Sequence, residues 1–324
     1  MIAFEQRAST VLFNLLRSHR REGYFFLPAN ICPIVPITLA KAGRAFEFVD
    51  IDRKTLCMNC DGVVASWTGR RKGRPAGLLY ARTYGAVFDA SETFSTLKAI
   101  DPDALIIDDR CLCPPDFPET PADHVDVALY STGHVKSVDV GYGGYGVIRD
   151  GVPYFRAQRP FDSDSLSAIT ANYKHSLETR HAFAYRDCDW LDMSLPTEPL
   201  AVYRHRVEHE LENAIRQKTQ INTIYANRLP SAVQLPSVFN SWRFNIAVND
   251  KAAVLAAIRR ENLFASGFYD SLAGLFGPGT APVAENLHRR VVNLFNDRYF
   301  SPEQAHKLTD VLIGLERSHP GTLS

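Results

Sequence analysis

The stretch DVALYSTGHVKSVDVGYGGYGVI, residues 126–148, decides how the rest of the chain is interpreted. It opens with an apolar run at residues 127–130, which has the length of a buried strand and is too short for a helix. Small residues end this run, Lys136 stands alone in a loop, and glycines lead into a second apolar run that ends at Ile148. A lysine in such a loop is most often a surface residue. The alternative is a Schiff-base lysine, a desolvated amine that loses its proton readily and attacks a carbonyl carbon.

Composition restricts the class of protein. The chain has 324 residues, of which 45% are hydrophobic and 22% charged, as expected for a globular enzyme of one large α/β unit or two domains. Lys plus Arg and Asp plus Glu both total 36, so no net charge attracts nucleic acid or an anionic membrane. No apolar run approaches the length of a membrane span. In the N-terminal segment the basic residues follow the apolar ones, the reverse of a secretory signal, so we expect a cytoplasmic protein without nucleic-acid or membrane partners.

The spacing of four of the six cysteines makes them candidate metal ligands. Cys57 and Cys60 form a C-x-x-C pair, and Cys111 and Cys113 form a C-x-C pair. Neither pair is framed by the turn residues and histidines of a zinc module. We therefore interpret them as free thiols in a reducing compartment and predict no metal site.

Apolar segments in the first half of the chain alternate between strand and helix patterns. The predicted strands are 24–27, 46–51, 77–80, 104–107 and 127–130, and the predicted helices include 33–41 and 91–99. Such alternation is typical of a mostly parallel sheet covered by helices on both faces. Ligands bind at the carboxyl ends of the strands in sheets of this kind. Tyr84, Asp109, Ser131 and Lys136 all follow a strand's carboxyl end, so we expect these four residues to converge on a site.

A helix near the N-terminus is a second candidate for ligand binding. Ser9 or Thr10 is expected to cap it, because an apolar stripe at helical spacing follows. Free backbone N–H groups and the positive end of the helix dipole would attract an anion there. A plain helix cap without a ligand is the alternative explanation.

The second half of the chain has a different pattern. Residues 160–200 are expected to be irregular, and a long amphipathic helix is predicted from about 197 to 229. A strand at 242–248, a helix at 251–259 and a final helix that starts with the capping box at 301–304 follow. We therefore expect a large α/β domain at 1–196, and at 197–324 a linking helix with a small α+β domain.

Several segments, in order, resemble the DegT/DnrJ/StrS sugar aminotransferases, which are fold-type-I enzymes that use pyridoxal 5'-phosphate (PLP). The segments are LPANICPIVPITLAKAGRAFEFVDIDRKTL at 27–56, LIIDDRC at 105–111, the stretch 126–148 and ENLFASGFYDSL at 261–272. The resemblance covers nearly the whole chain, and it rests on the order and spacing of the segments rather than on any single one. It implies an α/β fold with a mostly parallel sheet and a homodimer with shared sites.

The resemblance also implies roles for individual residues. Lys136 would bind PLP covalently, and Asp109 would face the pyridine nitrogen. Ser131 and the helix start at Ala8, Ser9 and Thr10 would hold the phosphate. Asn172 in the segment NYK would reach the phosphate of the partner subunit. Tyr84, from its place after a strand's carboxyl end, is expected to contact the cofactor.

The sequence departs from the family pattern at two positions. Leu112 stands where members usually have a glutamine near the phenolic oxygen of the cofactor, and Cys32 stands where an aromatic residue commonly stacks on its ring. The resemblance implies amino transfer from an amino acid, expected to be glutamate, to a keto nucleotide-sugar for polysaccharide or glycan biosynthesis. The alternative is a degenerate member that binds PLP or a sugar nucleotide in a structural or regulatory role. A sugar dehydratase is disfavoured, because such relatives carry histidine in place of the lysine.

Overall fold

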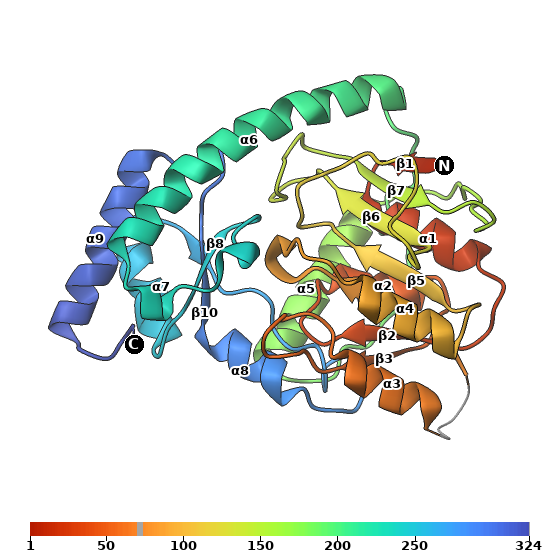
Figure 1. Ribbon diagram of the computed structural model, residues 1–324, viewed down its shortest axis with the longest axis horizontal. Helices are drawn as coiled ribbons and strands as arrows, with labels where there is room; N and C mark the ends of the chain where they lie inside the picture. Colours follow the sequence, from red (N-terminus) through yellow and green to blue (C-terminus); the bar gives the residue numbers. More distant parts are fainter. Residues whose placement is uncertain (70–73, 324) are drawn as a thin grey trace.

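The computed structural model describes residues 1–69 and 74–323, which form a large and a small part joined by one long helix. Figure 1 shows this helix, α6 (Leu200–Arg228), arching from the large part to the small one. α6 begins close to the predicted domain boundary, and the division into 1–196 and 197–324 stays a prediction. Both the amphipathic helix and the α+β character of the C-terminal part are as the sequence predicted.

A seven-stranded sheet forms the centre of the large part, in the order β1-β7-β6-β5-β4-β2-β3. The strands are β1 (Ile2–Glu5), β2 (Tyr24–Pro28), β3 (Phe46–Val49), β4 (Pro75–Ala81), β5 (Leu105–Asp109), β6 (Val127–Ser131) and β7 (Gly144–Ile148). The five strands from β6 to β3 are parallel to their neighbours, whereas β7 runs antiparallel to both β6 and β1. The mostly parallel sheet predicted from the alternating pattern is therefore confirmed.

Helices cover both faces of this sheet, because alternate residues of each strand point to opposite sides. On one face the odd-numbered residues of β5 and β6 pack with α1 (Ala8–Ser18), α2 (Ile34–Lys41) and α5 (Ser163–Thr179). On the other face the even-numbered residues of β4 and β5 pack with α3 (Cys60–Thr68) and α4 (Ser91–Ile100). Asp109 and Ser131 therefore belong to the α1 face, and Asp108 belongs to the α3 face.

The small part is built on a three-stranded antiparallel sheet in the order β8-β10-β9. Its elements are β8 (Phe244–Ala247), α7 (Lys251–Arg260), β9 (Ala265–Ser266), α8 (Pro282–Arg290), β10 (Val291–Leu294) and α9 (Pro302–Ser318). The predicted capping box is present: the Gln304 N–H donates to the Ser301 hydroxyl, and the Ser301 N–H donates to the Gln304 side chain. The last turns of α6 complete the apolar core of this part.

The two parts are also tied together at the N-terminus of α8. The backbone N–H groups of Val283 and Ala284 donate to the two carboxylate oxygens of Asp50 at 2.9 and 3.0 Å. Asp50 follows β3, so a carboxylate of the large part satisfies the free N–H groups and the dipole of this helix. This contact fixes α8 against the edge of the large sheet.

Several local predictions were wrong. Arg7, and not Ser9 or Thr10, is the N-cap of α1, and no side chain caps that helix. The stretch 160–200 was expected to be irregular, yet it contains the 17-residue α5, whose Asp162 N-cap accepts hydrogen bonds from the next turn. α3 begins at Cys60 with Asn59 as its N-cap. The sequence analysis interpreted Cys60 as part of a C-x-x-C pair and did not predict this helix. The strands β1 and β10 and the helix α8 were also missed.

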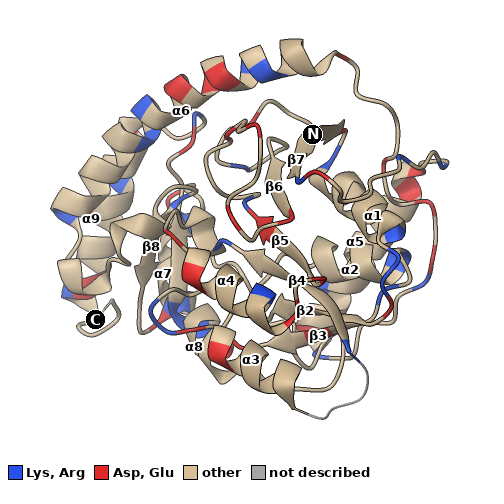
Figure 2. Cartoon of the chain, turned by 45° about the vertical axis from the view of Figure 1, so that its right-hand side comes forward, with Lys and Arg blue, Asp and Glu red and all other residues tan. Residues whose placement is uncertain are grey.

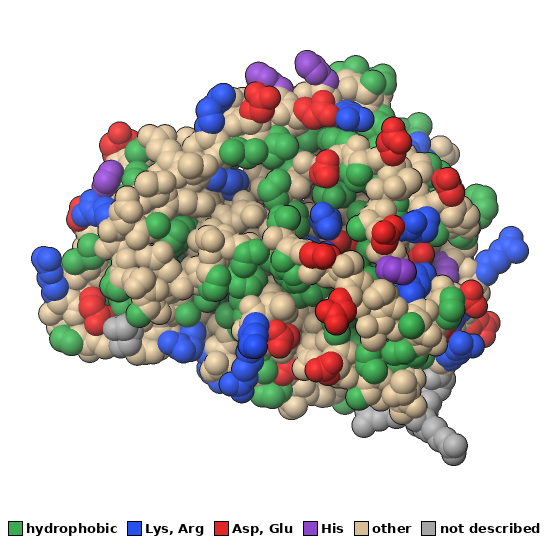
Figure 3. Space-filling view, in the orientation of Figure 1, with side chains coloured by type: hydrophobic (Ala, Val, Ile, Leu, Met, Phe, Trp, Pro, Cys, Tyr) green, Lys and Arg blue, Asp and Glu red, His purple; other side chains and the backbone are tan. Residues whose placement is uncertain are grey.

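One face of the molecule shows how acidic and basic side chains are distributed. On the face shown in Figure 3, acidic and basic side chains are interspersed, in keeping with the balanced totals of 36 and 36. Across residues 1–69 and 74–323, no helix combines the length and the hydrophobicity that a membrane span requires. In the same residues no group of three or more His, Cys, Asp or Glu side chains is arranged to hold a metal ion, and all six cysteines are free thiols.

Candidate active site

A cavity of about 220 Å³ lies at the carboxyl ends of β5 and β6, on the α1 face of the sheet. The residues that line it are Arg7, Ala8, Ser9, Leu12, Cys32, Ile34, Val35, Thr38, Asp109, Cys111, Leu129, Ser131, Gly133, His134 and Lys136. The structure thus brings together five of the residues predicted from the sequence: Ala8, Ser9, Asp109, Ser131 and Lys136.

One end of the cavity is the uncapped N-terminus of α1. Arg7 has extended backbone geometry, and its carbonyl accepts the Thr10 N–H at 3.0 Å, which leaves the Ala8 and Ser9 N–H groups without a partner among the described residues and open to a ligand. Gly144 allows the helix to approach β7, because a Cβ there would come within 2.0 Å of the Ala8 nitrogen. The Ser9 and Ser131 hydroxyls and the Arg7 guanidinium complete a site suited to a phosphate dianion.

Thr10 is not part of this cavity. Its side chain is fully buried, and the hydroxyl donates to the Asp192 carbonyl at 2.6 Å. The sequence placed Thr10 beside Ser9 but could not show that the helix turns this hydroxyl toward the core. Thr10 therefore anchors residues 190–193 to α1 and does not face a ligand.

Asp109 supplies a buried carboxylate to the other end of the cavity. Its side chain lies in the interior of the molecule, where Figure 2 shows the acidic end of β5, and one oxygen accepts the Cys111 N–H at 3.0 Å. Burial raises the pKa of Asp109, while the Cys111 hydrogen bond and the charge of Lys136 lower it. A carboxylate in this position favours a cationic partner.

Asp108, the neighbouring carboxylate, faces the opposite side of the sheet. It forms a two-pronged ion pair with the buried Arg82 at 2.7 and 3.0 Å and accepts from Arg110 at 2.8 Å. Arg82 also lies over the rings of three aromatic residues. Asp108 is thus fully engaged in the core between β5 and α4 and has no access to the cavity.

Lys136 is held by hydrogen bonds of its two neighbours. The Val135 carbonyl accepts the Trp242 indole N–H at 2.6 Å, and the Ser137 hydroxyl donates to the Ser241 carbonyl at 3.1 Å. Val135 has a φ of 59°, a strained value for a β-branched residue. Contacts from the segment before β8 therefore fix the backbone on both sides of Lys136. Its amine makes no hydrogen bond or ion pair with the residues that the structure describes.

A small cavity of about 30 Å³ lies beside Lys136 and Asp109 and contains the two departures from the family pattern. Cys32 and Leu112 both line it, and Tyr269, from the segment after β9, closes it. Burial raises the pKa of the Tyr269 phenol, and the hydroxyl makes no hydrogen bond within residues 1–69 and 74–323. Tyr269 therefore provides a hydroxyl that can form a hydrogen bond in this cavity, whereas the Leu112 side chain cannot form one.

Two residues predicted for the site lie elsewhere in this chain. Tyr84 is buried under the small part, where its hydroxyl donates to the Phe268 carbonyl at 2.7 Å and its ring is parallel to Trp242. Asn172 is exposed on α5, and its amide donates to the Ala184 carbonyl at 3.4 Å. Neither lines the cavity, and a role of Asn172 in a partner subunit stays a prediction.

Sequence reasoning also missed residues of the site. Arg7 precedes the predicted helix start directly, and His134 and Cys111 lie within two residues of Lys136 and Asp109, so adjacency was an available signal. Tyr269 follows Lys136 by more than a hundred residues, and although it lies in the segment 261–272 that carries the resemblance, nothing in that segment singled it out for the site. Only the packing of the small part brings it to the site.

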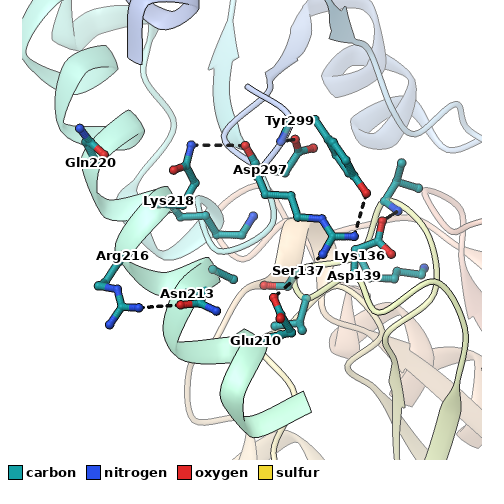
Figure 4. Close-up of a pocket in the computed structure, with 15 residues that line it drawn as sticks. Lys136, Ser137, Asp139, Glu210, Asn213, Arg216, Lys218, Gln220, Asp297 and Tyr299 are labelled. Carbon is teal, nitrogen blue, oxygen red and sulfur yellow. Dashed lines mark hydrogen bonds and ion pairs between the residues drawn. The ribbon is translucent and has the colours of Figure 1, made fainter. Parts of the chain in front are cut away.

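A larger cavity, of about 490 Å³, lies on the other side of Lys136, between its loop, α6 and the segment 297–299 (Figure 4). Its charged lining residues are Lys136, Asp139, Glu210, Arg216, Lys218, Asp297 and Arg298. Arg298 donates to the Tyr299 hydroxyl at 2.7 Å and lies 4.0 Å from Glu210. Lys218 is buried and donates to the Trp242 carbonyl and to Asn296. Lys136 lines both this cavity and the cavity of about 220 Å³ at the N-terminus of α1.

No protein-family model matches the chain, and no curated protein matches its sequence. Solved structures do match. A DegT/DnrJ/EryC1/StrS aminotransferase from Brucella abortus is 17% identical, with a TM-score of 0.65, covering 97% of this chain and 85% of its own. The sugar aminotransferase CalS13 from Micromonospora echinospora is 15% identical, with a TM-score of 0.70 and coverages of 97% and 87%. The Helicobacter pylori aminotransferase PseC is 11% identical, with a TM-score of 0.69 and coverages of 98% and 87%.

These likenesses establish the class of fold. The chain has the fold-type-I architecture of PLP-dependent aminotransferases, as the sequence predicted. Within that class, the fold is the one that the DegT/DnrJ/EryC1/StrS sugar aminotransferases share. Identities of 11–17% extend over nearly the whole chain, so both the large sheet and the small part are included in the match.

Proposed function

We propose that this protein is a PLP-dependent aminotransferase that transfers an amino group from an amino acid to a keto nucleotide-sugar. One observation carries the proposal: the Lys136 amine and the buried Asp109 carboxylate line one cavity whose other end is the uncapped N-terminus of α1. A lysine, a carboxylate and a phosphate site are the three groups that PLP requires. Glutamate is the donor that the resemblance implies, and a homodimer is the assembly.

The residues present fit the cofactor. The N–H groups of α1, the Ser9 and Ser131 hydroxyls and Arg7 would hold the phosphate. Asp109 would lie against the pyridine nitrogen and keep it protonated, since a buried carboxylate favours a cationic neighbour. When bound, PLP supplies an electron sink for the negative charge that develops at the α-carbon of the amino donor.

Lys136 acts as both nucleophile and proton carrier in this proposal. Its amine is free of hydrogen bonds to the described residues and would hold the cofactor covalently. When not bonded to the cofactor, the same amine would take the proton from the α-carbon of the amino donor and return it as a general acid. The hydrogen bonds of Val135 and Ser137 hold the Lys136 backbone in place during these steps.

The larger cavity is the candidate site for the acceptor. It opens next to Lys136, and its lining offers the cations Arg216 and Arg298 together with amide groups of α6. Cations suit a diphosphate, and amide and hydroxyl groups suit a sugar. A role in polysaccharide or glycan biosynthesis is part of the same proposal.

A second candidate function is a binding protein that holds PLP or a sugar nucleotide without turnover. Cys32 and Leu112 favour it, because a thiol cannot stack as a ring does and leucine cannot form the hydrogen bond of the usual glutamine. The unpaired Tyr269 hydroxyl in the same small cavity favours the enzyme, since it can supply the missing hydrogen bond. Cytoplasmic location remains an expectation from the sequence.

The test begins with cofactor attachment. Protein reconstituted with PLP should show a visible absorbance band that borohydride abolishes, and peptide mapping should find the reduced cofactor on Lys136. Glutamate added before borohydride should convert the band to that of the amino form of the cofactor. A label on another lysine would overturn the site, whereas labelled Lys136 without conversion by any common amino donor would favour the binding protein. Lys136→Ala is the control and should show neither band nor label.

A further inference from the structure

A separate cavity of about 270 Å³ lies between the end of α5, the segment 270–273 and α8. It is lined by Arg180, Asp270, Ser271, Ala273, Glu285, His288 and Arg289. None of these residues lines the cavities at Lys136, and the proposed function uses none of them. Three of them, at positions 285, 288 and 289, share one face of α8, since residues three and four apart are neighbours on a helix.

Two buried polar atoms of this cavity have no partner within the described residues. They are the Ser271 hydroxyl oxygen, in a residue that is 6% exposed, and Nδ1 of His288. Nε2 of His288 lies 3.0 Å from an Asp270 carboxylate oxygen and therefore carries the hydrogen of that contact. Burial and then the charge of Lys251 lower the pKa of His288, so the neutral ring leaves Nδ1 as an acceptor. Unpaired buried polar atoms are costly, and a ligand at this position would pair them.

Two guanidinium groups of this cavity can donate hydrogen bonds to an anion, and the carboxylates of Asp270 and Glu285 line it as well. Arg180 lies 3.2 Å from Asp270, and Arg289 donates to Asn286 at 3.3 Å. A guanidinium has five N–H donors, so each arginine keeps most of its donors free. Both side chains are exposed, which places them at the mouth of the cavity where a ligand enters.

We propose that this cavity binds a small carboxylate that carries a hydroxyl or ammonium group on the adjacent carbon. Arg180, Arg289 and the Ser271 hydroxyl would donate to the carboxylate, which accepts through both oxygens. The adjacent hydroxyl or ammonium would donate to Nδ1 of His288. Glu285, one of whose oxygens accepts the Ala281 N–H at 3.0 Å, would face an ammonium group. This pairs both orphaned atoms.

The test uses three ligands of nearly equal shape: L-lactate, L-alanine and propionate. Each is titrated by calorimetry into the full-length Lys136→Ala protein, so that binding through the cofactor site does not contribute and failure of the proposed function leaves this result unaffected. We expect one site per chain for L-lactate or L-alanine, and binding of propionate at least tenfold weaker, because it lacks the donor to His288. If L-lactate has the higher affinity, the hydroxyl is the preferred donor to His288; if L-alanine has the higher affinity, the ammonium is. Propionate binding as tightly as both, or no binding by any of the three, would overturn the proposal.

Two variants locate the site. Ser271→Ala should weaken binding about tenfold, the usual effect of one lost hydrogen bond to a charged group. Its melting temperature should stay unchanged, since the hydroxyl has no partner to lose within residues 1–69 and 74–323. Arg289→Met, at the exposed mouth, should weaken binding by a similar factor. Ser163→Ala, an exposed hydroxyl at the start of α5, is the matched control and should bind as the parent does. Equal affinity in all three variants would place the ligand elsewhere and overturn the assignment.

Discussion

The cavities of about 220 and 490 Å³, which are both lined by Lys136 and are called the smaller and the larger cavity below, are built in different ways. All residues of the smaller cavity lie between Arg7 and Lys136, at neighbouring strand ends and one helix start of the large sheet. The larger cavity combines the loop of Lys136 with α6 and with the segment 297–299 of the small part. The proposed bond-making chemistry thus relies on one rigid sheet, whereas recognition of the acceptor depends on how two parts of the chain pack. The predictions below test whether the cavities can be damaged separately.

The largest effect is expected for Asp109→Asn in the smaller cavity. The amide cannot keep a pyridine nitrogen protonated, so conversion of the bound cofactor by glutamate should slow by a hundredfold or more, and each tenfold corresponds to about 1.4 kcal/mol in the transition state. Single-turnover absorbance with glutamate measures this rate. The melting temperature should change little, because Asp109 pairs with no arginine or lysine at ion-pair distance among the described residues.

Asp108→Asn is the matched control, and its expected effects are the opposite. It removes a partner from the buried Arg82, and breaking a buried ion pair in this way costs about 3–5 kcal/mol of stability. Where the variant folds, its rate of cofactor conversion should stay close to that of the wild type. A rapid Asp109→Asn enzyme together with an inactive, stable Asp108→Asn enzyme would contradict the face assignment of β5.

A smaller effect is expected for Arg298→Met in the larger cavity. Loss of one charge-assisted hydrogen bond to the acceptor, about 1.5–3 kcal/mol, should raise KM for the keto sugar nucleotide tenfold or more. Conversion of the cofactor by glutamate should remain unchanged, because Arg298 does not line the smaller cavity. Steady-state kinetics with each substrate varied in turn separate the two effects. The control variant Arg204→Met, on the exposed part of α6, should change neither the KM nor the rate of cofactor conversion. An equal loss in both half-reactions of Arg298→Met would show that the two cavities cannot be damaged separately.

The smallest effect is expected in the pH dependence of stability, through Lys218. Burial lowers the pKa of this amine from 10.5 to about 7 in the folded chain. Between these values the unfolded chain binds more protons, so stability should rise with pH by at most about 1.4 kcal/mol per pH unit. Urea unfolding at pH 7 to 9 should show this rise in the wild type relative to Lys218→Met. The exposed Lys174→Met should follow the wild type, and parallel profiles for Lys218→Met would contradict a buried amine at this junction.

Much of the smaller cavity could be predicted from local patterns. Short apolar runs located β5 and β6, and the parallel arrangement placed Asp109 and Ser131 at one edge of the sheet. Alternation along β5 separated Asp109 from Asp108. The same reasoning assigned Thr10 and Tyr84 to the site, but neither residue lines the cavities at Lys136. Their hydroxyls donate to the Asp192 and Phe268 carbonyls, partners that are 182 and 184 residues away in the chain.

The sequence by itself determined the alternation of strands and helices and the places of Asp109 and Ser131 at strand ends, because each follows from periodicity within about twenty residues. Only the tertiary structure decided what surrounds them. Tyr269 reaches the small cavity, Trp242 holds the loop of Lys136, and Asp50 caps α8 through contacts that join residues more than a hundred positions apart. Such contacts depend on how separate elements pack, and a local pattern carries no information about which distant side chain will arrive at a given site.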